Sequence, residues 1–201
     1  MENKRDLLAG GLSGWQVADR YDFKEHGEIR LNDQGAVVLG QGKPATGLSY
    51  RGALPGAHYK LSWEARRTDG SDFFCGLTFP IRGNFATLIV GGWGGGVVGI
   101  SNVDGMSAVE NETTDYRDFK NDQWYKMVLD INAKSLIVTI DDARVIDLDH
   151  DDRKYSVWWE QEQMAPIGFA TWYSASEIRK VYLSESNATD SGSALDAQSR
   201  R

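Results

Sequence analysis

The 201-residue sequence has one cysteine and four prolines, and no hydrophobic run approaches the length of a membrane span. The single cysteine, Cys75, excludes an internal disulfide and leaves the redox compartment open. Basic residues are also few, with 22 Lys and Arg against 29 Asp and Glu. The resulting formal net charge of −7 argues against nucleic acid as a partner, because phosphate binding needs a basic face.

The two ends of the chain are polar. Met1 to Asp6 is charged and lacks the apolar stretch of a secretory signal. If a signal was trimmed, we expect a periplasmic or extracellular protein, and otherwise a cytoplasmic one, so the compartment stays open. After Ser186 large apolar residues are almost absent, which predicts a disordered tail at 186–201 behind a single domain at 7–185.

What the sequence has in quantity is period-two alternation of apolar and polar residues, interrupted by many of its 22 glycines. The expected strands are 27–31, 36–39, 47–50, 58–67, 72–79, 85–90, 97–101, 123–132, 136–140, 144–148, 167–172 and 178–184. These are too many strands for one open sheet, and crossover helices for a parallel arrangement are lacking. The sequence therefore predicts an all-β, two-sheet antiparallel jelly-roll sandwich.

Three hairpins are expected from short polar turns. Ala133-Lys134 and Asp141-Asp142 separate consecutive strands in the second half of the chain. Asp69-Gly70 is predicted to join 61–67 to 72–79 in a third hairpin, with Gly70 as a left-handed bulge residue. The apolar faces predict burial of a set of core residues: Leu61, Trp63, Cys75, Leu77, Leu129, Ile140 and Phe169.

The order of several segments resembles a known family. The segments are Leu12-Ser13-Gly14-Trp15, Tyr59 to Arg66, Gly76 to Phe79, Trp124-Tyr125-Lys126, Val138 to Asp142, Pro166 to Trp172, and Ile178 to Leu183. They resemble the bacterial 3-keto-disaccharide hydrolase domains of the concanavalin A-like lectin and glucanase superfamily. The resemblance covers roughly residues 7–184 and implies a jelly roll whose concave face or loop rim meets a sugar.

The best polar constellation predicted from alternation is Glu64, Arg66 and Asp72 on one sheet face. Carboxylates beside an arginine can bind sugar hydroxyls, and Glu64 or Asp72 could act as a general acid, so we take both as candidate catalytic residues and Arg66 as a substrate-binding residue. The alternative is an exposed cross-strand ion pair, which polar-out alternation in a sheet favours.

Tryptophan supplies the remaining candidate substrate-binding residues: Trp93, Trp158 and Trp172. Trp93 lies in the stretch Gly91 to Gly96, where it either folds back onto the core or forms an exposed platform for a sugar ring. Trp158 and Trp172 each adjoin a second aromatic residue, and alternation then points one ring of each pair to each face. Core packing is the favoured interpretation for both pairs.

No metal site or cofactor is expected. The acidic cluster at 147–152 lacks the spacing and glycine of a calcium loop, which favours a solvated loop, although a structural calcium ion stays open.

From the resemblance and the candidate residues we expect a carbohydrate-binding or carbohydrate-processing domain with a saccharide as its partner. The sequence leaves open whether it hydrolyses a glycosidic bond or only holds the sugar, and its oligomeric state. The alternative function is a non-catalytic adhesion or scaffold module that binds another protein.

Overall fold

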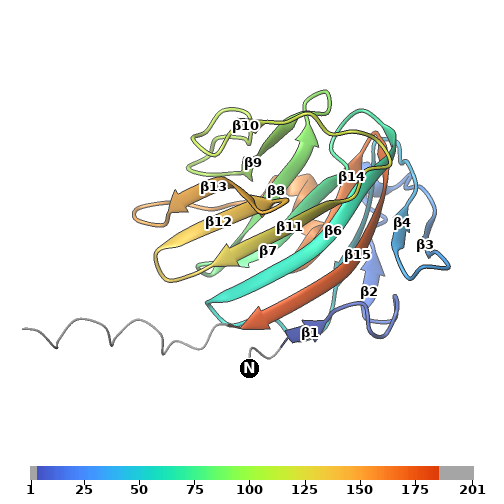
Figure 1. The fold of residues 1–201 in the computed structure, drawn as a ribbon, viewed down its shortest axis with the longest axis horizontal. Coiled ribbons are helices and arrows are strands. Elements are labelled where there is room, and N and C mark those ends of the chain that lie inside the picture. Colours follow the sequence, from blue (N-terminus) through green and yellow to red (C-terminus); the bar gives the residue numbers. More distant parts are fainter. Residues whose placement is uncertain (1–3, 186–201) are drawn as a thin grey trace, which may run out of the picture.

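The computed structural model describes residues 4–185, and the tail predicted at 186–201 lies outside the described residues. Two antiparallel sheets pack face to face, which confirms the predicted fold class (Figure 1). The first sheet has the order β13 (Ala143–Asp149), β12 (Ser135–Ile140), β11 (Tyr125–Ile131), β6 (Tyr59–Gly70), β15 (Ser174–Glu185), β4 (Val37–Leu39) and β3 (Ile29–Leu31), with β1 (Lys4–Asp6) paired to β15.

The second sheet has the order β10 (Asp115–Tyr116), β9 (Val97–Ser101), β8 (Asn84–Gly92), β7 (Cys75–Ile81), β14 (Ile167–Trp172), β5 (Ala45–Tyr50) and β2 (Trp15–Val17). Two short 3-10 helices, η1 (Tyr21–Phe23) and η2 (Trp159–Met164), accompany the strands. All twelve predicted strands are present, with ends displaced by a few residues at most in all but one. The exception is the last, which begins four residues earlier than predicted, at Ser174.

The core lies between the sheets and contains every residue predicted for it. The seven predicted side chains are all 2% exposed or less. Trp63 of β6 and Cys75 of β7 meet across the sandwich, where the indole Nε1 donates a hydrogen bond to the Cys75 Sγ at 3.3 Å. Burial raises the pKa of the Cys75 thiol to about 12, as expected for an inert core cysteine.

Two of the three predicted hairpins form, and the third is wrong. β11 pairs with β12, and β12 pairs with β13 through Asp141 and Asp142, both in the left-handed region with φ of 49° and 64°. The predicted pairing of β6 with β7 does not occur: β6 pairs with β11 and β15, whereas β7 pairs with β8 and β14. The chain crosses from one sheet to the other at Ser71 to Phe74.

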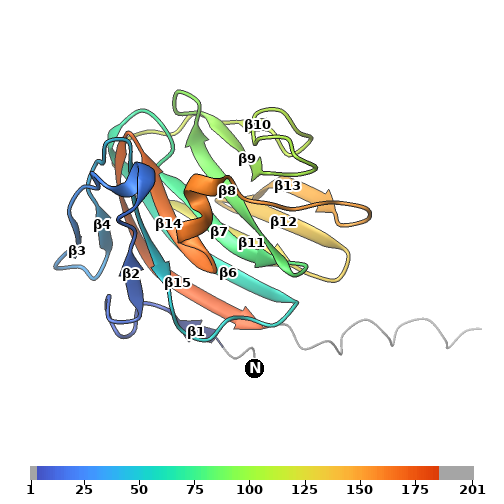
Figure 2. The ribbon, with the colours of Figure 1, turned by 180° about the vertical axis from the view of Figure 1, so that it is seen from behind.

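Small residues on the outer face of the second sheet allow other segments to pack closely on it. Figure 2 shows η2 lying across β14 and β7 on this side. A Cβ at Gly168 would lie 2.4 Å from the backbone oxygen of Met164, so only glycine permits this approach. Similarly, a Cβ at Gly99 would lie 2.4 Å from the Ala108 oxygen. Part of the face is therefore covered, and the uncovered part forms the floor of a pocket.

Candidate functional site

A pocket of about 400 Å³ opens on the outer side of the second sheet. It is bounded by the crossover from β6 to β7, the end of β8, η2 with the residue before it, and the end of β14. Four of the six site residues predicted from the sequence line it: Asp72, Trp93, Trp158 and Trp172. Phe73, Ile89, Glu160 and Gln161 complete the lining. Its size lies within the usual range for small-ligand sites.

The tryptophans of the pocket present ring surface to solvent. Trp93 is 50% exposed and Trp158 is 49% exposed, while Trp172 is partly buried. Trp172 stacks on Phe73 with centroids 6.1 Å apart and planes inclined by 25°. Because Phe73 is buried, it fixes the orientation of the Trp172 ring.

The glycine stretch positions Trp93 at the rim. The chain turns between β8 and β9 with Gly91, Trp93, Gly94 and Gly95 all at positive φ. A Cβ at Gly91 would lie 2.8 Å from the Phe74 ring, so the turn sits tightly over the underlying aromatic residue. Of the two interpretations that the sequence left open for Trp93, the structure shows the exposed one.

Trp158 and Trp159 correct the expectation of core packing. Both rings are about half exposed, because Trp158 precedes the 3-10 helix η2 and strand alternation does not apply there. The indole Nε1 of Trp158 donates a hydrogen bond to the Ser101 hydroxyl at 3.2 Å, which anchors the ring to the end of β9. Trp159 packs edge to face against Tyr21 at 5.0 Å, outside the pocket.

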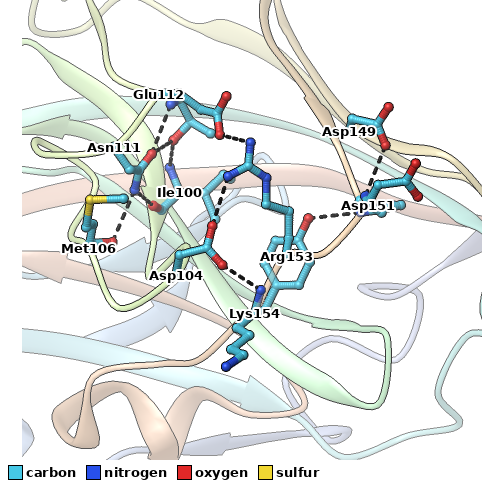
Figure 3. Close-up of polar contacts among 12 residues, drawn as sticks. Ile100, Asp104, Met106, Asn111, Glu112, Asp149, Asp151, Arg153 and Lys154 are labelled. Atoms are coloured by element: carbon cyan, nitrogen blue, oxygen red, sulfur yellow. Dashed lines mark hydrogen bonds and ion pairs between the residues drawn. The ribbon is translucent and has the colours of Figure 1, made fainter.

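The segment before Trp158 is fixed by the polar network in Figure 3. Arg153 contacts both Asp104, at 2.9 Å, and Glu112 in the loop after β9. The backbone N–H of Lys154 donates to Asp104 at 2.8 Å, and that of Asp104 donates to the Lys154 carbonyl at 2.8 Å. These contacts join residues 153–156 to the loop after β9 and so hold Trp158 in place.

Two carboxylates face the pocket. One oxygen of Asp72 accepts a hydrogen bond from the Phe73 backbone N–H at 2.7 Å, which fixes the carboxylate against the crossover. Glu160 is partly buried on η2. Within residues 4–185 neither carboxylate forms an ion pair, so both can accept hydrogen bonds from a ligand. Glu160 was not among the residues that the sequence predicted for the site.

Gln161 adds a polar group that the sequence did not predict. Its side chain is 6% exposed, and its Oε1 is buried without a hydrogen-bond partner among the described residues. An unsatisfied buried acceptor costs about 1–3 kcal/mol, so such groups in a binding site point to a missing partner.

Arg67 connects the crossover to the loop that follows β10. Its side chain is 6% exposed and donates three hydrogen bonds, to Asn121 Oδ1 at 2.6 Å, the Phe119 carbonyl at 2.7 Å and the Asp72 carbonyl at 3.3 Å. Burial lowers the pKa of Arg67, and the charges of neighbouring acidic groups oppose this effect. The residue therefore holds the backbone of Asp72 in position beside the pocket.

Glu64 and Arg66 do not join Asp72. They lie on the outer face of the first sheet, where Glu64 accepts from Arg179 and Lys180, both at 2.7 Å, and Arg66 pairs with Glu177 at 2.7 Å. The predicted three-residue constellation is therefore wrong, because it depended on the hairpin between β6 and β7. The ion-pair alternative describes Glu64 and Arg66 instead.

The environment of Glu64 also disfavours a role as a general acid. Burial alone would raise its pKa, but the hydrogen bonds and charges of Lys180 and Arg179 outweigh burial and hold the pKa below its ordinary value. A carboxyl group that donates a proton near neutral pH needs the opposite shift.

The acidic cluster at 147–152 is occupied by local contacts. Asp147 pairs with Arg144 at 2.7 Å, and Asp149 accepts from the Asp151 backbone N–H at 3.1 Å. Across residues 4–185 there is no group of three or more His, Cys, Asp or Glu side chains placed to hold a metal ion. The absence of a cofactor stays a prediction.

Within residues 4–185 no helix is long and apolar enough to cross a membrane.

Solved structures share this fold at low sequence identity. Carbohydrate-binding module CBM66 from Bacillus subtilis aligns with a TM-score of 0.56 at 13% identity, covering 86% of this chain and 96% of that chain. Domain 4 of AbnA, a GH43 extracellular arabinanase from Geobacillus stearothermophilus solved with arabinotriose, aligns with a TM-score of 0.57 at 15% identity. The alignment covers 90% of this chain and 87% of that chain. The GH16 endo-beta-1,3(4)-glucanase SCLam aligns with a TM-score of 0.55 at 10% identity, covering 90% of this chain and 88% of that chain.

No curated protein sequence matches the chain. A family match does exist, and it spans residues 5–184, nearly the whole of the described fold. At the level of a carbohydrate-binding or carbohydrate-processing jelly-roll domain, the function predicted from the sequence is confirmed. The chain belongs to the family of 3-keto-alpha-glucoside-1,2-lyase-like domains.

Proposed function

We propose that the chain binds a saccharide in the pocket between Trp93, Trp158 and Trp172. The observation that carries the proposal is the convergence of these rings with two carboxylates, Asp72 and Glu160, that form no ion pair within residues 4–185. Aromatic faces pack against the apolar C–H side of a pyranose. Carboxylates accept hydrogen bonds from its hydroxyl groups.

The shape of the site supports a small ligand over a protein partner. A scaffold module would be expected to present a broad, flat aromatic patch. Here the exposed rings of Trp93 and Trp158 line a pocket instead. Two of the structures with this fold are a carbohydrate-binding module and an arabinanase domain in complex with arabinotriose, and both support the same ligand class.

Calorimetric titration tests the proposal. The probes are maltose, sucrose and trehalose, which are α-glucosides, and their 3-keto derivatives, chosen because the family description specifies a 3-keto-α-glucoside. We expect saturable binding of at least one probe and a weaker affinity in Trp158→Ala. The absence of binding by every probe, with the protein folded, would refute a saccharide site for this ligand class.

A second candidate function is elimination across C1 and C2 of a 3-keto-α-glucoside. The two pocket carboxylates, Asp72 and Glu160, and the family description together favour it. The C3 ketone acidifies the proton on C2, so a carboxylate can remove that proton as a general base. The C2–H electron pair forms the C1–C2 double bond, the glycosidic C1–O bond breaks, and the departing oxygen takes a proton. No oxidant or reductant is required.

The two carboxylates can be tested against a third carboxylate outside the pocket. We expect Asp72→Asn or Glu160→Gln to lower turnover of 3-keto-maltose by two or more orders of magnitude, since general acid–base groups contribute about that much. Glu64→Gln is the control, because Glu64 lies on the other sheet. Turnover is followed by release of glucose and by the ultraviolet absorbance of the conjugated enone. If wild type binds 3-keto-maltose without releasing glucose, elimination is excluded and the binding function stands.

A further inference from the structure

A second cavity adjoins the candidate site. It has a volume of about 430 Å³ and is lined by Arg67, by Gly94 to Gly96, and by Tyr116 to Phe119. Trp93 lines the first cavity and Gly94 the second, so the two open on either side of the same turn. A Cβ at Gly95 would lie 2.9 Å from the Ser71 carbonyl oxygen, which shows that this turn packs directly against the crossover.

The turn carries no side chain at Gly94 and Gly95. Gly94 and Gly95 have φ of 88° and 109°, conformations that L residues with side chains rarely adopt. A Cβ at Gly94 would meet no atom within 4 Å, so this position faces open space. A ligand can therefore pass over the turn close to its backbone.

The second cavity offers the same kinds of group as the first. Tyr116, on the edge strand β10, is 68% exposed, and its ring is available for stacking. Arg117 and Asp118 supply donors and acceptors of both charge signs, a combination that suits hydroxyl groups better than a charged ligand. The Arg117 backbone N–H donates to the Gly96 carbonyl at 2.9 Å, which attaches this wall to the glycine turn.

Arg67 links the wall of the second cavity to Asp72, a lining residue of the first. It holds the Asp72 carbonyl beside the first, and its guanidinium lines the second, where a Cβ at Gly95 would lie 3.1 Å from Nη1. Each terminal nitrogen has two N–H groups, of which the described residues accept one. The remaining N–H groups have no acceptor among the described residues, and Arg67 lines the second cavity.

We propose that a saccharide chain whose first two units occupy the pocket extends across the glycine turn, placing a third unit in the second cavity between Tyr116 and Arg67. This rests on the proposed saccharide-binding function and specifies its substrate as an oligosaccharide longer than a disaccharide. The Tyr116 ring stacks on the third unit, while Trp93 stacks on a unit in the pocket.

The test compares maltose, maltotriose, maltotetraose and maltopentaose by calorimetric titration. We expect affinity to rise with length in wild type. Tyr116→Ala should lose about three- to tenfold in affinity for the longer chains and little for maltose, because one aromatic contact is removed. Tyr116→Phe keeps the ring and should retain the gain. Trp93→Ala should weaken binding of every length.

Tyr21→Ala is the matched control, since Tyr21 is 62% exposed and lines neither cavity. If Tyr21→Ala loses the length dependence and Tyr116→Ala keeps it, the chain extends over Trp159 and the proposal is overturned. If maltose binds but longer chains bind no tighter, the second subsite is refuted and the pocket stands. If no malto-oligosaccharide binds at all, the extended site is refuted, whereas saccharide binding in the pocket fails only if sucrose, trehalose and the 3-keto derivatives also do not bind.

Discussion

Replacing Trp93 is the sharpest test of the pocket, and its effect can be calculated from exposure. A tryptophan contributes about 150–250 Å² of surface, and Trp93 leaves 50% of its own exposed, or about 100 Å². Covering all of it with a ligand is worth about 2.5 kcal/mol at about 25 cal/mol per Å², and covering one ring face about half as much. Trp93→Ala should therefore raise Kd roughly 8- to 70-fold.

Trp93→Gly should remove the same ring with little effect on folding. Trp93 has φ of 49°, a left-handed conformation that costs a residue with a side chain about 1–2 kcal/mol. Trp93→Gly removes this cost while raising the entropy of the unfolded chain, so we expect its stability to stay close to that of wild type. Trp93→Gly and Trp93→Ala should then weaken binding equally.

Calorimetry and urea denaturation of the same variants check these expectations. Trp159→Ala is the matched control, because Trp159 is 52% exposed and adjoins Trp158 but lies outside the pocket. Unchanged saccharide affinity in Trp93→Ala would refute the stacking role. An equal loss in Trp159→Ala would show that the affinity depends on the general aromatic surface and not on this pocket.

Three further predictions concern the framework. Glu64→Gln should leave saccharide affinity unchanged. Because the folded-state pKa of Glu64 is lowered, the stability that Glu64 contributes is present above its ordinary pKa of 4.5 and is lost as pH falls through the lower folded-state value. Acid titration of unfolding should show this loss in wild type and not in the variant. Cys75 should resist thiol reagents at pH 8 in the native protein and react after urea unfolding, since burial raises its pKa to about 12; rapid native labelling would contradict its burial. Asp142→Gly should leave the free energy of unfolding within about 0.5 kcal/mol of wild type, because relief of the φ of 64° is offset by the entropy of the unfolded chain and the ion pair with Lys126 is exposed; a thermal midpoint lower by many degrees would contradict this.

Alternation predicted the strands because the sandwich buries one face of most of them. The failed hairpin shows what alternation does not contain. The apolar faces around Trp63 and Cys75 do meet, as expected, but they meet across the core and not side by side in one sheet. A period of two records which side of a strand is buried and carries no information about which strand lies beside it.

The candidate site was only partly predictable for the same reason. Trp93 could be recognised because glycines on both sides prevent a regular strand and bring the ring to a turn. Trp158 and Glu160 could not be placed, since period-two spacing does not hold where the chain enters η2. The assignment of Glu64 to the site failed because its partners Arg179 and Lys180 come from β15, far away in sequence and adjacent only in the sheet.

The contacts of Arg67 explain how a pocket built from loops can be rigid before a ligand arrives. The crossover that carries Asp72 and the loop that contains Phe119 and Asn121 belong to distant parts of the sequence. One buried guanidinium ties all three together through hydrogen bonds of 2.6–3.3 Å. Groups fixed in this way lose little additional freedom on binding, so more of the contact energy appears as affinity. The same side chain lines the second cavity and holds the backbone of Asp72 at the first, so it links the two places where sugar units are proposed to bind.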